Sequence, residues 1–347
     1  HQWFGDLVTA TSGEHHWLQE GFATYYALLA EREVFGDDYF HWKLYQNAEG
    51  LQQASQSDTI PILSAKASSS TYYEKGAWAL HILRETVGPD NFRKAVQHYL
   101  EKYKFRSVDT DLFLDEVQKV KNFDREAFRK SWLLNPGFEV AQALTALNKN
   151  AMMREYFKLG TLSQIPFSEK KSALLQIIRS DAYFAVKQEV VYQLLDVPFD
   201  EKKDLLTEAM RTNNPEVRQA IARTITKIPA EFLSEYETLL NDNSYVTREI
   251  ALNALCRDFP EKRSSYLDKM DGQMGLNDKN IRLLWLTLAL KTDAYRPDKK
   301  TAYYDELIGY AQPGEEASIR QSALQKLLFI NKGDSNVLPL NVKEPVV

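Results

Sequence analysis

The sequence has a single cysteine, Cys256, in 347 residues. It therefore cannot form a disulfide within the chain, and a metal or redox site built from several cysteines is excluded for the same reason. No run of roughly 18 or more apolar residues is present, which is the length that a membrane-spanning helix needs. Glycine and proline are also few, at 14 and 12 residues, so collagen-like and low-complexity architectures are excluded.

A surplus of positive charge is missing as well. The 43 lysines and arginines are outnumbered by 48 aspartates and glutamates, which gives a formal net charge of −5. A protein that binds nucleic acid needs basic residues to neutralise phosphates, so we expect no nucleic-acid partner. The composition of 44% hydrophobic and 26% charged residues is typical of a globular protein. The length is sufficient for about two domains, each with its own core.

The histidines are unevenly placed, which indicates that the two parts of the chain do different work. All six lie in the first hundred residues: His1, His15, His16, His41, His81 and His98. The same region has apolar residues at helical spacing and almost no strand signals, and it predicts helices over Trp17–Phe35, Tyr73–Val87 and Asp90–Tyr103. A loop rich in serine and glutamine, residues 54–71, separates the first two.

From about residue 141 the pattern changes to short amphipathic helices separated by Pro, Asn and Asp. Similar apolar helix openings recur there at intervals of 31, 29, 35 and 38 residues, and they are Val186, Val217, Val246, Ile281 and Ile319. Repeats of this length resemble HEAT or armadillo repeats, whose helix pairs stack into a solenoid because one pair alone cannot bury its apolar face. A non-repetitive α-helical bundle is the alternative.

The residues that carry chemistry lie in the first 140. Four short motifs occur there: His1-Gln2-Trp3-Phe4-Gly5, Glu20-Gly21-Phe22-Ala23, Tyr73-Glu74-Lys75-Gly76-Ala77 and Trp132-Leu133-Leu134-Asn135-Pro136-Gly137-Phe138. Eighteen residues lie between His1 and Glu20. Histidine nitrogen and carboxylate oxygen are among the ligands that zinc prefers in proteins.

These four motifs, in this order, resemble the aminopeptidase N family of zinc metallopeptidases, a gluzincin family that includes leukotriene hydrolase. The resemblance is close over residues 1–140 and concerns only the architecture of residues 141–347. In that family two histidines on one helix and a glutamate from the next helix bind the zinc. The resemblance assigns His1 and Glu20 as zinc ligands, and it assigns to Tyr73 the role of the phenol that reaches the scissile carbonyl.

Chemistry explains why these residue types would be needed. A zinc ion with three protein ligands keeps a position for water and lowers the pKa of that water to about 7. When the water attacks a peptide, charge grows on the carbonyl oxygen, and one donor such as Tyr73 is worth roughly 10²–10³ in rate. The alternative interpretations are a surface carboxylate for Glu20 and core packing for Tyr73, with Tyr72 as the neighbouring candidate.

The family's first zinc histidine would stand four residues before His1, and its general-base glutamate three residues before, outside the printed sequence. We therefore expect an inactive portion of an aminopeptidase that binds zinc weakly or not at all. Because the sequence opens inside a motif and without Met, we expect the native N-terminus elsewhere. Cytoplasmic and periplasmic or secreted locations both stay open. Endopeptidase action stays open too, since the family's amine-binding segment is not in the sequence.

Some residues near the motifs depart from the family pattern or compete with its ligands. Gln19 stands where the family has asparagine, and His15 stands where it has a supporting aspartate. Side chains of adjacent residues on a helix point about 100° apart, so we interpret His15 and His16 as supporting or surface residues. We expect Lys75 to fix the start of a helix rather than to act as a base.

The predicted fold is mostly α. Residues 1–138 are expected to form the helical lobe of a thermolysin-like peptidase domain, residues 141–338 a HEAT/armadillo-like α-solenoid, and residues 339–347 an extended tail. The expected substrates are peptides, cleaved after their N-terminal residue, and no membrane span is expected. The alternative functions are a catalytically dead family member, or a helical-repeat scaffold that binds peptides or proteins.

Overall fold

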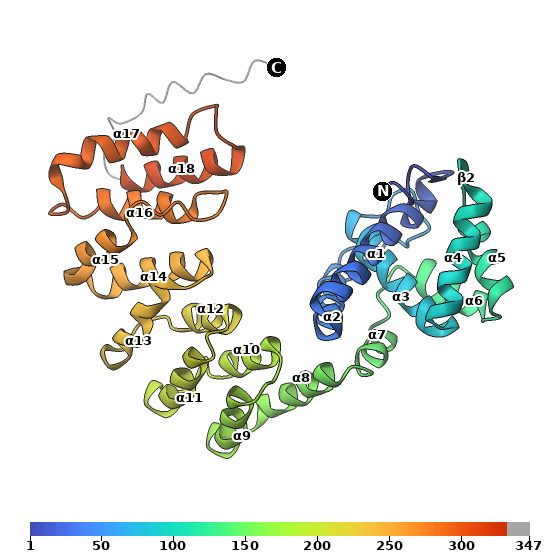
Figure 1. The fold of residues 1–347 in the computed structure, drawn as a ribbon, viewed down its shortest axis with the longest axis horizontal. Coiled ribbons are helices and arrows are strands. Elements are labelled where there is room, and N and C mark those ends of the chain that lie inside the picture. The colour runs from blue at the N-terminus through green and yellow to red at the C-terminus, as the bar shows by residue number, and fades with distance from the viewer. Residues whose placement is uncertain (332–347) are drawn as a thin grey trace. The chain divides into compact units, whose positions relative to one another are not determined.

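The computed structural model describes residues 1–331, so the predicted tail 339–347 lies outside the described residues (Figure 1). The chain divides into two compact units, His1–Lys158 and a second unit that begins at Leu159. Helices provide nearly all of the regular structure in both, which confirms the predicted mostly-α fold. Within residues 1–331 no helix combines the length and the apolar character needed to cross a membrane.

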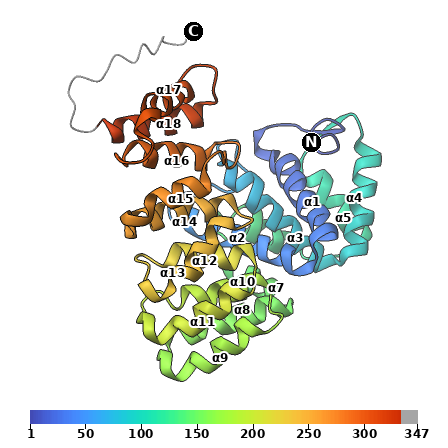
Figure 2. The same ribbon diagram turned by 60° about the vertical axis from the view of Figure 1, so that its left-hand side comes forward.

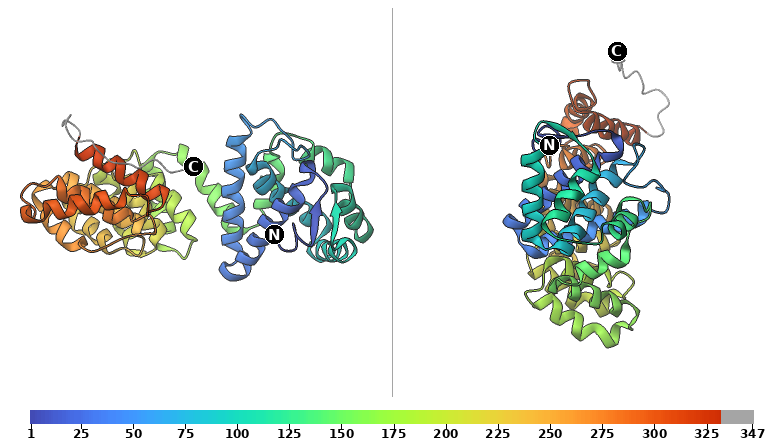
Figure 3. Two further views of the ribbon diagram at one scale, coloured as in Figure 1. Left: turned by 90° about the horizontal axis from the view of Figure 1, so that it is seen from above. Right: turned by 90° about the vertical axis from the view of Figure 1, so that its right-hand side faces the viewer.

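The first unit is a set of packed helices with a very small sheet. Two short strands, β1 (Val8–Ala10) and β2 (Arg106–Val108), pair in parallel. In this unit α1 packs against α2 and α3, and α4 packs against α5, as the blue-to-green helices of Figure 3 show. The helices are α1 (Trp17–Phe35), α2 (Asp37–Ala54), α3 (Gly76–Val87), α4 (Pro89–Tyr103), α5 (Thr110–Val120), α6 (Arg125–Phe128), α7 (Val140–Leu147) and most of α8 (Ala151–Thr161).

Aromatic side chains fill the core of the first unit. Trp17, Phe22 and Tyr25 are fully buried on α1. Buried Leu18, Phe22 and Tyr25 follow the i, i+4, i+7 spacing that places side chains on one helix face. Phe22 stacks on Phe4 with ring centroids 4.3 Å apart and meets Phe113 of α5 edge-on at 5.0 Å. Each such burial contributes roughly 1.5–3 kcal/mol. This apolar face fixes the rotation of α1, and with it the direction of its polar residues.

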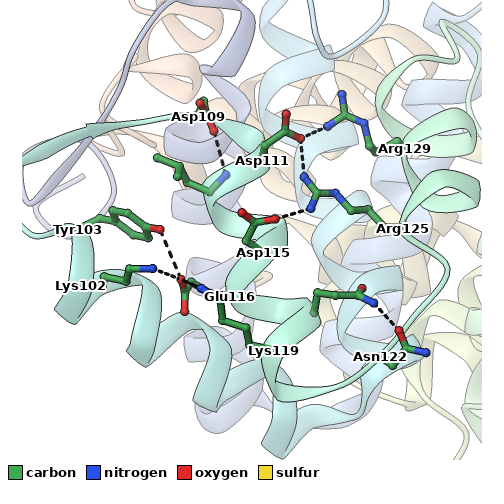
Figure 4. A network of polar contacts seen from close by, with 12 residues as sticks. Lys102, Tyr103, Asp109, Asp111, Asp115, Glu116, Lys119, Asn122, Arg125 and Arg129 are labelled. Carbon is green, nitrogen blue, oxygen red and sulfur yellow. Dashed lines mark hydrogen bonds and ion pairs between the residues drawn. The ribbon is translucent and has the colours of Figure 1, made fainter.

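Ionic contacts tie α4, α5 and α6 together (Figure 4). The Glu116 carboxylate, 5% exposed, accepts hydrogen bonds from Lys102 at 2.8 Å and Lys119 at 2.7 Å. Burial by itself would raise the pKa of Glu116, but these two hydrogen bonds outweigh it and lower the pKa. The other ion pairs of this group join Arg125 to Asp111 and Asp115, and Arg129 to Asp111.

The link between α7 and α8 contacts other helices of the first unit. Lys149 pairs with Glu85 at 2.7 Å, and the Asn150 amide donates to Asp38 at 2.9 Å. The two compact units therefore separate about 20 residues later than the predicted boundary near residues 138–141. That boundary, as a division between two functional domains, stays a prediction.

The second unit is a stack of helix pairs, which confirms the predicted HEAT/armadillo-like solenoid. The even-numbered helices contact one another in chain order from α10 to α18, and each odd-numbered helix packs on an even-numbered neighbour (Figure 2). The helices are α9 (Phe167–Arg179), α10 (Phe184–Tyr192), α11 (Phe199–Arg211), α12 (Pro215–Thr224), α13 (Leu233–Glu237), α14 (Tyr245–Asp258), α15 (Arg263–Met270), α16 (Asn280–Leu290), α17 (Lys300–Tyr310) and α18 (Ala317–Ile330).

The apolar openings found in the sequence lie within the first three residues of the even-numbered helices. One of them, Val246, is displaced by one residue from the position that Val217 occupies. Asn214 caps α12 by accepting the Val217 N–H at 3.0 Å, and Ser244 caps α14 by accepting the Thr247 N–H at 3.3 Å. Val217 and Thr247 are both fully buried, so the equivalent of Val217 is Thr247 and not Val246. Because a polar residue stands at this buried position, the spacing of the repeats looks less regular in the sequence than it is in the structure.

A second series marks the odd-numbered helices. Prolines stand directly before α9 and α11, and at or directly before the 3-10 turn that leads into α13, α15 and α17. Their intervals are 32, 31, 31 and 37 residues: Pro166, Pro198, Pro229, Pro260 and Pro297. Proline is tolerated at a helix start because the first N–H groups have no partner inside the helix. The two series together define the helix pairs more regularly than the apolar openings do alone.

Arginines in the first turn of the even-numbered helices connect successive pairs. Arg218 binds Asp242 with Nε 2.5 Å from Oδ2, and the two side chains are only 11% and 2% exposed. Arg248 donates to the Asp242 backbone carbonyl and to Gln273. Because these contacts reach from one helix pair to the next, they complement the apolar packing between pairs.

We expect Arg218→Met to lower the free energy of unfolding by about 3–5 kcal/mol, because it leaves the buried Asp242 carboxylate without its cation. Arg211→Met is the matched control, since the Arg211–Glu208 pair lies at the surface and such pairs are worth about 0–1 kcal/mol. Urea denaturation of the two variants measures both values. Equal losses would contradict a special role for the buried pair.

Candidate functional site

His1 and Glu20 lie together at the start of the first unit. The distance from His1 Nε2 to Glu20 Oε2 is 3.2 Å. Glu20 is in the first turn of α1, where the positive end of the helix dipole stabilises a carboxylate. Its Oε2 atom is buried and makes no hydrogen bond within the described part of the chain. The site therefore contains a buried carboxylate oxygen that is close to an imidazole nitrogen but makes no hydrogen bond in the described residues.

Tyr73 belongs to the same site. It lies on a single turn of π-helix, Thr71–Lys75, which we call the Tyr73 turn and which leads directly into α3. The phenol is 38% exposed. Hydrogen bonding with the Glu20 carboxylate, followed by partial desolvation and the charges of Glu20 and Glu74, raises the pKa of Tyr73. The structure thus brings His1, Glu20 and Tyr73 together, while their chemical roles stay predictions.

The residues on the N-terminal side of Tyr73 anchor the Tyr73 turn. The Thr71 hydroxyl donates to the Asp58 carboxylate at 2.9 Å. The Tyr72 hydroxyl is directed at the Gly13 carbonyl, 3.0 Å away, and Tyr72 is buried. Tyr72 therefore serves as a structural contact, and the neighbouring Tyr73 is the tyrosine near Glu20. A π-turn of this kind is frequent at functional sites.

Lys75 anchors the other end of the Tyr73 turn. Its buried ammonium donates to the backbone carbonyls of Asn135 at 2.6 Å and Pro136 at 3.0 Å. Burial lowers the pKa of Lys75 to about 8, against the opposing charges of Asp58 and Glu139. Both carbonyl contacts belong to the Trp132–Phe138 motif, so Lys75 joins the third sequence motif to the fourth and fixes the helix start, as expected.

The other residues considered as supporting groups bind elsewhere. His15 Nδ1 lies 3.0 Å from the Thr110 hydroxyl at the start of α5, and the Trp17 indole N–H donates to the same hydroxyl at 3.0 Å. Gln19 accepts the Ala10 N–H from β1 at 3.2 Å. These contacts hold the first turn of α1 against β1 and α5, so they support the position of Glu20 through the backbone.

The donor atoms suit zinc, but only two of them are present. Imidazole nitrogen and carboxylate oxygen are ligand types that zinc accepts. Glu20 Oε2 contacts His1 but makes no hydrogen bond in the described residues, so it is an oxygen that a cation would satisfy. No set of three or more His, Cys, Asp and Glu side chains in residues 1–331 is arranged to bind a metal. His1 and Glu20 therefore fit two of the three protein ligands of a catalytic zinc site.

A hollow adjoins His1 on the side of α1. Its volume is about 460 Å³. Trp3 on its rim is 64% exposed. The lining is mostly aromatic and small apolar: His1, Gln2, Trp3, Phe4, Ala23, Tyr26 and Ala27.

Sequence reasoning did not single out Glu74. Its Oε2 atom is buried without a hydrogen bond in the described residues, and its charge contributes to the raised pKa of Tyr73. The sequence feature that could have indicated Glu74 is its position directly after Tyr73 in the third motif. Motif spacing does not reveal burial, so this signal was not sufficient.

Comparisons with known proteins find matches to parts of both units. Residues 1–132 match the peptidase family M1 domain, and residues 172–256 match HEAT repeats. The leucyl aminopeptidase of Saccharolobus solfataricus is 29% identical over 171 residues, which are 46% of this chain and 22% of that protein. The aminopeptidase N of Lactobacillus helveticus is 29% identical over 158 residues, 42% of this chain and 19% of that protein.

Native LTA4 hydrolase from yeast is among the solved structures to which the chain is similar. It is 16% identical in sequence, with a TM-score of 0.45, and the alignment covers 94% of this chain and 52% of that one. The chain thus spans about half of that structure and matches about a fifth of each of the two aminopeptidases.

We expect Glu74→Met to raise the free energy of unfolding by about 1 kcal/mol, because the substitution removes a buried polar atom that has no partner. Glu33→Met, at an exposed position of α1, is the control and should change it by about 0.5 kcal/mol or less. Thermal and urea denaturation compare the two variants. A clear loss of stability in Glu74→Met would mean that the carboxylate has a stabilising partner after all.

Proposed function

Residues 1–132 belong to peptidase family M1, and from this premise we propose that the chain is a portion of a zinc-dependent aminopeptidase. The intact protein would remove N-terminal residues from peptides by hydrolysis. The observation that carries the proposal is the meeting of His1, Glu20 and Tyr73, with His1 Nε2 3.2 Å from Glu20 Oε2. The aminopeptidases similar to this chain support the same reaction class.

His1 and Glu20 would provide two protein ligands of the zinc. The third ligand and the general base would come from residues that precede His1 in a longer chain. Zinc bound in such a site supplies Lewis acidity and lowers the pKa of a water molecule to about 7. The position of Glu20 in the first turn of α1 places its carboxylate beside the imidazole. This chain by itself would bind zinc weakly and would be inactive.

Tyr73 would donate a hydrogen bond to the carbonyl oxygen of the scissile peptide bond. A donor must keep its proton at neutral pH, and the raised pKa of Tyr73 ensures this. The contacts of Thr71, Tyr72 and Lys75 hold the Tyr73 turn in place before substrate arrives. Catalysis by a hydrogen-bond donor depends on such preorganisation.

We expect Glu20→Ala in the full-length protein to reduce the zinc content from about one per chain to less than about 0.1, because an incomplete ligand set binds the ion weakly. The zinc content is measured by inductively coupled plasma mass spectrometry after dialysis. Glu14→Ala removes an exposed carboxylate nearby and should leave the zinc content unchanged. A Glu20→Ala protein with one zinc per chain would refute the ligand assignment.

We expect Tyr73→Phe to lower kcat by roughly 10²–10³ without loss of zinc, because it removes one hydrogen-bond donor to the developing negative charge. Peptide hydrolysis and zinc content are measured on the same sample. Tyr192→Phe, at an exposed tyrosine of α10, is the control, and it should leave kcat unchanged. Unaltered turnover in Tyr73→Phe would remove its role, and a zinc-free, inactive wild type would favour the scaffold alternative.

A further inference from the structure

Two glycines bring α1 and the start of α3 into direct backbone contact. A Cβ atom added to Gly21 would lie 2.9 Å from the carbonyl carbon of Gly76 and 3.0 Å from its Cα. A Cβ atom added to Gly76 would lie 3.0 Å from the Cα of Gly21. The atoms that would be struck are backbone atoms, so no side chain can rotate away and the two helices themselves would have to separate.

Backbone conformation does not explain these two glycines. Neither belongs to the residues with positive φ, and Gly76 has helical angles of φ −60° and ψ −44°. Glycine inside a helix is destabilising relative to alanine. Alanine at either position would prevent the close approach of the two helices.

The two glycines are close in sequence to the carboxylate and the phenol of the site. Glu20 directly precedes Gly21, and Tyr73 is three residues before Gly76, which is about one helical turn. Any increase in the separation of the helices at Gly21 and Gly76 would therefore move Tyr73 away from Glu20.

We infer that Gly21 and Gly76 are positioning residues whose backbone contact sets the distance between the Glu20 carboxylate and the Tyr73 phenol. The inference rests on the proposed function and extends it, because it names what aligns the zinc ligand with the hydrogen-bond donor. The aligned pair fixes where the carbonyl oxygen of the scissile bond can sit, since that oxygen must lie within reach of the phenol and of the zinc at once.

The chain provides matched controls. Gly50 on α2 and Gly160 on α8 are exposed helical glycines, and a Cβ atom at either would meet nothing within 4 Å. Alanine at these positions has the same chemistry as alanine at Gly21 or Gly76 but no contact to disturb. It should raise helix stability and leave activity unchanged.

The test is a double-mutant cycle in the full-length protein with Gly76→Ala and Tyr73→Phe. We expect Gly76→Ala to lower kcat by about 10²-fold, since small displacements of a catalytic group have effects of this size, with a smaller change in KM. In the Tyr73→Phe background, where the donor is already missing, Gly76→Ala should change kcat by about twofold or less. An equal loss in both backgrounds would indicate a general structural effect and overturn the inference.

Zinc affinity gives a second readout that does not depend on turnover. Gly21→Ala should raise the dissociation constant for zinc by about 10-fold or more through displacement of Glu20, and Gly50→Ala should not change it. Should Gly76→Ala not fold, it is repeated in the background of Gly50→Ala and Gly160→Ala. Failure to fold there would make the contact a folding requirement only and overturn the inference.

The two proposals fail in different ways. A wild-type protein that neither binds zinc nor cleaves peptides would refute the proposed function. A wild type with both properties, combined with unchanged kcat and zinc affinity in the Gly76→Ala and Gly21→Ala variants, would refute the positioning role alone.

Discussion

The backbone contact between Gly21 and Gly76 is the constraint on which the arrangement of the site depends. It brings two helices from distant parts of the sequence as close as backbone atoms allow. The buried aromatic face of α1 fixes the rotation of that helix, and the contacts of Thr71, Tyr72 and Lys75 fix the Tyr73 turn. With rotation and separation both set, the Glu20 carboxylate and the Tyr73 phenol have little freedom to move apart.

The electrostatics of the site follow from this closeness. The carboxylate oxygen of Glu20 is buried without a hydrogen bond, and a second unpaired carboxylate oxygen, that of Glu74, belongs to the residue after Tyr73. Buried carboxylate oxygens without a hydrogen bond are unfavourable for folding, and groups of this kind are candidates for a functional site. Hydrogen bonding with the Glu20 carboxylate is the main cause that raises the pKa of Tyr73, and the charges of Glu20 and Glu74 act in the same direction.

The second unit is built in a different way, from repeated helix pairs that stack on one another. Each helix pair buries its apolar face only against its neighbours, and arginines such as Arg218 link one pair to the next. Thr247 is a polar residue at an apolar position of the repeat, and it is fully buried there. This substitution made the repeat look less regular in the sequence than it is in space.

The sequence by itself determined the helical class and the repeats, because helix periodicity and capping are local properties of the chain. It also placed His1, Glu20 and Tyr73 in recognisable motifs. Only the tertiary structure decided that Gly21 meets Gly76, that Lys75 binds the Asn135 and Pro136 carbonyls, and that residues 140–158 pack with the first unit. These outcomes depend on contacts between residues far apart in the chain, and local spacing carries no record of them.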